Sequence, residues 1–146
     1  MAEDLKLHGV VVLHKYFVWA AYMYDAYRQT LLKRKHNSSW DDPDERLLFM
    51  YMSYWYATLY VVIEGWRNLG LSDPTVDTLL ASPYVALLKR YRHGVFHFQK
   101  DYFDKRYLDF VDEGKEGLIW VRSLHKAFFQ YLQQWDQSHN LDGTPK

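Results

Sequence analysis

The chain contains no cysteine, which excludes every structural or catalytic feature that depends on a thiol. A disulfide framework, a thiolate nucleophile and a zinc site of the cysteine type all require that residue. The N-terminus is acidic, with Glu3 and Asp4, whereas a secretory signal is basic and ends at a small-residue cleavage site. We therefore expect a protein of the reducing cytoplasm.

Net charge is also lacking. Lys and Arg total 18 and Asp and Glu total 18, so the formal net charge is +0. A neutral chain has no global positive field of the kind that draws proteins to nucleic acid regardless of sequence. Any contact with nucleic acid must therefore come from a local basic patch.

One stretch, residues 47–63, carries no formal charge and deserves comparison with a membrane span. It falls just short of a comfortable span, and Tyr51, Tyr54, Tyr56 and Tyr60 run through its middle. Membrane helices place tyrosine at the headgroup belts instead. The stretch therefore predicts a buried helix and no membrane partner.

The chain is rich in aromatic residues, with 13 Tyr, 8 Phe and 6 Trp among 146 residues. So many rings must cover a core or an interface. The length is close to that of one common domain. We expect a single helical-bundle domain over residues 1–137 and a flexible C-terminal tail over residues 138–146.

Short polar residues before proline mark three helix starts, at Asp42-Pro43, Asp73-Pro74 and Ser82-Pro83. No strand pattern competes with the helical spacing. The sequence thus predicts an all-α, up-down bundle of four to five helices with two long N-terminal helices. The expected ranges are residues 4–35, 44–69, 74–80, 83–93 and 117–135, with ordered helical structure continuing from the fourth helix to about residue 110.

Apolar residues surround the second predicted helix on nearly every side, from Leu48 to Trp66. A helix of a monomeric bundle keeps one side in water, so this pattern indicates a second contact surface. Homodimerisation is the simplest explanation.

Cations and imidazoles concentrate in one segment that begins at Lys89. Between Lys89 and Arg106, Lys and Arg outnumber acids by six to two. Histidine moves protons near neutral pH, and guanidinium groups fit phosphate oxygens. In RNA the 2′-hydroxyl can attack the neighbouring phosphate, so the protein need supply only proton transfer, alignment and charge stabilisation. Such chemistry requires no metal or other cofactor.

The sequence Arg92-His93-Gly94-Val95-Phe96-His97 resembles the signature of the HEPN family. These are small helical bundles, many of which are metal-independent endoribonucleases, and their signature is an arginine, a polar residue and a histidine four to six positions after the arginine. The resemblance covers roughly residues 54–110. It implies a HEPN-like bundle that pairs as a homodimer, so that two copies of Arg92 and His97 face one cleft.

By that resemblance His97 is the general acid or base, Arg92 binds the scissile phosphate, and His93 orients or supplements them. Asparagine is the commoner residue at the position of His93, and Gly94 is expected to loosen the helix. We assign Arg90, Lys89, Lys100 and Glu64 to substrate binding, the last of them also as a partner for Arg92 or a histidine. Arg90 also satisfies the spacing to His97, so the arginine role can shift by two positions.

Three structural or chemical alternatives stay open. Arg92 can pair structurally with Glu64 or Asp101, and His97 can be a surface or interface histidine that is hydrogen-bonded to the backbone. A metal site of His93, His97 and Asp101 requires one helix through all three. The other histidines, including His36, are interpreted as structural.

The resulting hypothesis is a toxin- or defence-type endoribonuclease that cuts single-stranded RNA and leaves a 2′,3′-cyclic phosphate. A regulatory protein such as an antitoxin is a conceivable further partner. The alternative is a non-catalytic HEPN-like dimer that binds RNA, a nucleotide or a protein partner, because fold does not settle function.

Overall fold

The computed structural model describes residues 1–35 and 37–146. Within those residues the chain is all-helical, with no strand. The helices are α1 (Ala2–Leu32), α2 (Pro43–Asn68), α3 (Pro74–Leu80), α4 (Tyr84–Phe96), α5 (Lys105–Val111) and α6 (Gly114–Ser138). The predicted all-α class with two long N-terminal helices is confirmed. The predicted number of four to five helices is too low, because the described residues form six helices and the segment after α4 contains a separate helix, α5.

Polar side chains accept backbone N–H groups at the three predicted starts: Asp42 and Asp73 are N-caps of α2 and α3, and Ser82 precedes Pro83, the N-cap of α4. Asp42 accepts the backbone N–H of Asp44 at 2.9 Å before α2. Asp73 accepts two backbone N–H groups at the start of α3, and the Ser82 hydroxyl accepts the N–H of Tyr84 at 3.2 Å. Each cap satisfies a donor that has no partner inside its helix.

Several helix boundaries differ from the sequence-based expectation. Helix α4 continues past His93 to Phe96, and residues 97–104 form a loop where continuous helical structure was expected. A new helix, α5, begins after Asp104, whose side chain accepts the N–H of Arg106 at 2.9 Å. Helix α6 is longer than predicted at both ends, and its first residue, Gly114, has a φ of 60°.

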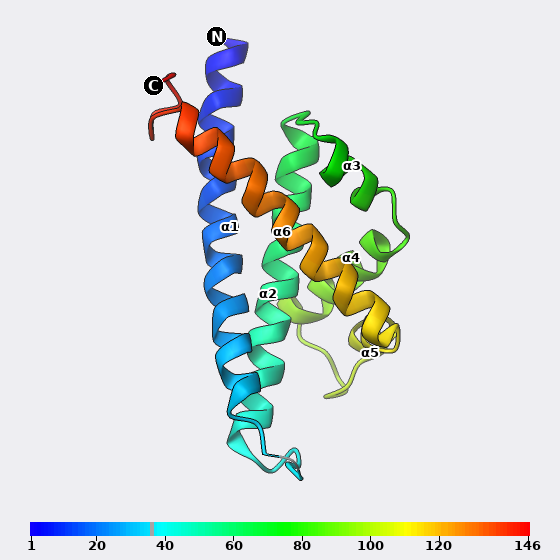
Figure 1. Cartoon of the computed structure of the whole chain (residues 1–146). Coiled ribbons are helices and arrows are strands. Elements are labelled where there is room, and N and C mark those ends of the chain that lie inside the picture. Colours follow the sequence, from blue (N-terminus) through cyan, green and yellow to red (C-terminus); the bar gives the residue numbers. More distant parts are fainter. Residues whose placement is uncertain (36) are drawn as a thin grey trace.

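Helices α1 and α2 form a long antiparallel hairpin, and α6 crosses it diagonally (Figure 1). The shorter helices α3, α4 and α5 lie beside α2, on the side away from α1 (Figure 1). The chain ends lie near each other at one end of the hairpin. After α6, residues 139–146 form a turn in which the N–H of Asn140 bonds to the carbonyl of Thr144 at 2.7 Å.

Helix α2 supplies more of the core than any other helix. It is long and apolar enough to cross a membrane, the one such helix in residues 1–35 and 37–146, and 44% of its most apolar window is buried inside the protein. Trp55, Leu59, Ile63 and Trp66 are almost completely buried. The packing of these side chains against other helices is what places α2 at the centre of the bundle.

A buried histidine lies where α1, α2 and α6 meet. The indole N–H of Trp55 donates to Nδ1 of His125 at 3.1 Å. The rings of Phe17 and Tyr24 lie 4.9 and 4.7 Å from the imidazole, centroid to centroid. Burial among these rings lowers the pKa of His125 to about 4, so the imidazole is neutral at pH 7.

This histidine should make the stability of the fold depend on pH. Because its folded pKa lies below the ordinary value of about 6.5, the unfolded chain binds more protons between pH 6.5 and 4. The stabilisation is complete above pH 6.5 and is lost as the pH falls to 4, by up to about 3 kcal/mol. We expect urea unfolding of His125→Asn, whose Oδ1 can take the place of Nδ1 as the acceptor for Trp55, to show a shallower loss over this range. Parallel stability curves for the two proteins would contradict the assignment.

Candidate functional site

Helix α4 displays the site because its two faces differ in polarity. Val85, Leu88, Tyr91 and Gly94 are buried at helical spacing. The opposite face, which carries Lys89, Arg90, His93 and Phe96, is exposed, and His97 follows it as an exposed C-terminal cap. The apolar stripe therefore turns the cations and imidazoles of the motif towards solvent.

Arg92 lies at the border between these two faces, against α2. Its Nη1 donates to both carboxylate oxygens of Glu64, each at 3.0 Å, and its guanidinium carbon is 4.9 Å from the ring centroid of Tyr60. The side chains of Arg92 and Glu64 are 25% and 38% exposed. The ion pair and the ring hold the guanidinium in one place at the edge of the core. The structure thus brings together Arg92 and Glu64, which are 28 residues apart.

The two histidines of the motif lie face to face. Their ring centroids are 4.2 Å apart with an interplanar angle of 30°, and the N–H of His97 donates to the carbonyl of His93 at 3.1 Å. Partial loss of hydration, and then the positive charges of His97, Arg106 and Arg92, lower the pKa of His93 below its ordinary value. The arrangement favours a neutral His93 near pH 7, which can accept a proton.

Ion pairs neutralise much of the expected basic patch. Arg90 pairs with Asp109 of α5, which also accepts a bond from Lys105 at 3.0 Å. Arg106 pairs with Asp104 at 3.1 Å. The sequence-based count of six cations and two acids covered only Lys89 to Arg106. It therefore left out Asp109 and Glu64, which pair with two of these cations. Of the cations assigned to substrate binding, Lys89 and Lys100 are exposed, whereas Arg90 is tied to α5.

Gly94 allows α5 to approach α4 closely. It was expected to loosen the helix, but α4 continues beyond it. The hydroxyl of Tyr107 donates to the carbonyl of Gly94. A Cβ at position 94 would lie 2.9 Å from Cε1 of Tyr107. The glycine is therefore required by packing against α5, and α4 remains helical to Phe96.

A groove of about 340 Å³ lies beside His97. Its walls include Phe49 of α2, Tyr102 of the loop and Tyr107 of α5, three rings that the sequence reasoning did not assign to the site. Phe49 is far from the other two in the sequence, and no sequence pattern indicated that the three rings line one groove. Gln99 shapes the loop, because its amide donates to the carbonyl of His97 at 2.7 Å and accepts from Arg106 at 2.9 Å.

The metal-site alternative required a helix through His93, His97 and Asp101. That condition is not met, because α4 ends at Phe96 and Asp101 lies in the loop. Over residues 1–35 and 37–146, no three His, Cys, Asp or Glu side chains are grouped so that they could hold a metal ion. His36, interpreted as structural, lies outside the described residues.

Fold and site together define an all-α bundle with an arginine and two adjacent histidines at the exposed end of one helix. Comparisons with protein-family models, curated proteins and solved structures find no match to this chain. The likeness to HEPN domains therefore rests on the motif of α4 alone.

The pKa of His93 can be measured by NMR titration of the imidazole C–H and N–H signals. We expect a value below 6.5, and we expect His97→Asn to raise it because a neighbouring positive charge is removed. His8→Asn, which changes an exposed histidine of α1, is the matched control and should leave His93 unchanged. A His93 pKa at or above 6.5 in the unmodified protein would contradict the described electrostatics.

Proposed function

We propose that this chain is a HEPN-like, metal-independent endoribonuclease of the toxin or defence type that cuts single-stranded RNA in the cytoplasm. The observation that carries the proposal is the contact between the imidazoles of His93 and His97, on the same exposed helix end as Arg92. Two imidazoles at one site can remove one proton and deliver another near neutral pH.

The proposed reaction is an internal transfer of the phosphoryl group. One imidazole accepts the proton of the 2′-hydroxyl, and the 2′-oxygen then attacks the adjacent phosphorus. The bond from phosphorus to the 5′-oxygen breaks, and the second imidazole, protonated at the outset, gives its proton to that oxygen. The products are a 2′,3′-cyclic phosphate and a 5′-hydroxyl. The lowered pKa of His93 suits the accepting role, which leaves the donating role to His97.

Arg92 would stabilise the charge that builds up on the phosphate oxygens. In the described part of the chain, its side-chain hydrogen bonds all use Nη1, so Nε and Nη2 remain as donors for a phosphate. Glu64 and the ring of Tyr60 fix the guanidinium before substrate arrives, and a fixed donor needs little reorganisation during the reaction.

A homodimer is part of this proposal. Leu47, Met50 and Tyr54 are exposed apolar residues of α2, and the ring of Tyr54 lies 6.3 Å from that of Phe96, one turn beyond Arg92. A second copy seated on this surface would cover the apolar side of α2 and bring a second motif near the first. Any regulatory protein, such as an antitoxin, would bind this assembly.

The ion pair of Arg92 with Glu64 also favours a second candidate function. A guanidinium held in this way can serve the fold alone. The chain would then be a non-catalytic HEPN-like dimer that binds RNA, a nucleotide or a protein partner through the same surface.

The nuclease activity can be tested on cellular RNA in the presence of a chelator. We expect fragments with 2′,3′-cyclic phosphate and 5′-hydroxyl ends, and at least about a hundredfold slower cleavage by Arg92→Ala and His97→Ala, since each removes charge stabilisation or proton transfer. The matched controls are Arg122→Ala and His8→Ala, exposed residues of α6 and α1. RNA left intact by every protein, or equally fast cleavage of the DNA analogue, would reject the nuclease. RNA binding without turnover would favour the second candidate.

The dimer can be tested by sedimentation equilibrium. We expect Tyr54→Asp to weaken self-association at least about tenfold, because it places a charge inside a desolvated surface. Tyr22→Asp, at an exposed tyrosine of α1, is the control and should associate like the unmodified protein. A monomer at every accessible concentration of the unmodified protein would refute the homodimer.

A further inference from the structure

The groove beside His97 has the shape and lining of a site for a flat ring. Phe49 and Tyr102 are stacked, with ring centroids 6.2 Å apart and an interplanar angle of 27°. Tyr107 meets Phe49 edge-on at 5.7 Å and closes another wall. Tyr102 is 61% exposed, so much of this side chain is accessible to a ligand. The groove volume, about 340 Å³, is sufficient for a nucleobase.

The polar groups of the groove are unequal in what they can offer a ligand. The side-chain amide of Gln99 is occupied at both ends, by the carbonyl of His97 and by Arg106. Asp101 is exposed at the groove, and its carboxylate makes no hydrogen bond or ion pair with any other residue in the described ranges 1–35 and 37–146. Besides His97, to which proton transfer is assigned, and the hydroxyl of Tyr102, the available side-chain polar group is therefore a carboxylate, which only accepts hydrogen bonds.

We propose that this groove binds a nucleobase of the RNA next to the scissile phosphate, and that Asp101 selects guanine. Guanine presents two adjacent donors, N1–H and N2–H, which match the two oxygens of a carboxylate. Adenine and cytosine each present one amino group beside a ring acceptor, and uracil presents one N–H between two carbonyls. Rings of Tyr102 and Phe49 would stack on any base, whereas the carboxylate distinguishes among bases.

His97 is one of the residues that line the groove. A base seated there would place its own ribose and phosphate close to the two histidines. The choice of RNA as the ligand rests on the proposed function, whereas the preference for guanine rests on Asp101 and the rings.

Binding can be measured without cleavage by fluorescence anisotropy. The probes are labelled 2′-O-methyl oligouridylates of one length, each with a single guanine, adenine or cytosine at the centre, because the methyl group blocks attack by the 2′-oxygen. We expect the guanine probe to bind about tenfold more tightly than the others, the preference that a paired carboxylate contact gives.

Two variants distinguish the contribution of the Asp101 carboxylate to binding from that of the aromatic rings. Asp101→Asn should abolish the guanine preference, since an amide has one acceptor and one donor group, while the other probes bind as well as before or better. Asp112→Asn, an equal change of charge at an exposed residue after α5, is its control and should keep the preference. Tyr102→Ala should weaken all probes about tenfold through lost stacking, whereas Tyr22→Ala should weaken none.

The outcomes for the groove and for the nuclease are distinct. Equal affinity for all probes, no binding of any probe, or a guanine preference that persists in Asp101→Asn would overturn the assignment of the groove. RNA cleavage that is indifferent to guanine, together with equal binding, would reject the groove and leave the nuclease standing. Guanine-dependent binding without any cleavage would support the groove and reject the nuclease.

Discussion

The rotational setting of α4 against α2 is the constraint on which the site depends. Tyr91 is completely buried, and its hydroxyl shares a 2.8 Å hydrogen bond with the hydroxyl of Ser53 in α2. Its ring also meets Tyr56 edge-on at 5.2 Å. Because successive helical residues are 100° apart, fixing Tyr91 inward sends Arg92 towards α2 and His93 towards solvent. A rotation of α4 by one residue would turn either His93 or Arg92 into the core and separate Arg92 from Glu64.

The charges around the site show why the neutral composition of the chain matters. Most of the cations near the motif are bound to carboxylates, so the site lacks a strong general attraction for polyanions. Binding of RNA would then depend on a few positioned groups. The neutral form of His93 fits this picture, because partial loss of hydration and then positive neighbours lower its pKa, while the charges of the arginines are partly compensated by acids. The electrostatics are thus better suited to aligning one phosphate than to holding a long strand.

The sequence contains enough local information to predict the helices and the motif, but not the partners of the motif. Asp42, Asp73 and Ser82 accept hydrogen bonds from backbone N–H groups two or three residues further along the chain. Such local contacts could be predicted from the sequence alone. The start of α5 was missed because Asp104 caps it without the proline that marked the other starts.

Contacts between distant segments were harder to predict. The bond between Arg92 and Glu64 could be guessed because both residues lie on predicted helices. The contact between Arg90 and Asp109 depends on the direction in which the chain returns after a loop that was expected to be helical. The groove could not be predicted either, because the loop after α4 is what brings Tyr102 to Phe49.

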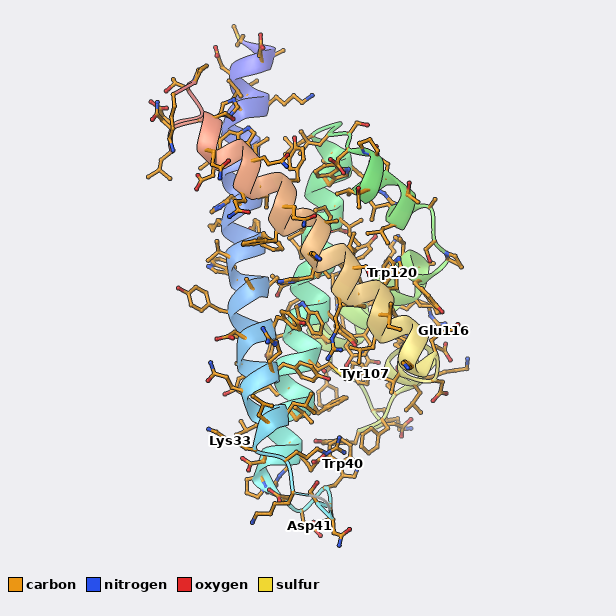
Figure 2. The ribbon with its side chains drawn as sticks, viewed as in Figure 1. Lys33, Trp40, Asp41, Tyr107, Glu116 and Trp120 are labelled. Carbon is orange, nitrogen blue, oxygen red and sulfur yellow. The ribbon has the colours of Figure 1, made fainter. Side chains whose placement is uncertain are left out.

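The aromatic richness of the chain has two structural uses. One set of rings, around Trp55 and Trp66, fills the core. A second set joins the turn before α2 to the loop after α4: Trp40 lies 4.7 Å from Phe103 and 5.7 Å from Phe49, ring centroid to ring centroid. Figure 2 shows Trp40 near the turn between α1 and α2, with Tyr107 further along the bundle. These rings anchor a loop that has no helix of its own to hold it, and that loop carries His97 at its start and Asp101 at its centre. The geometry of the candidate site is therefore set partly by the far end of the α1–α2 hairpin, where residues such as Trp40 would affect the site without touching it.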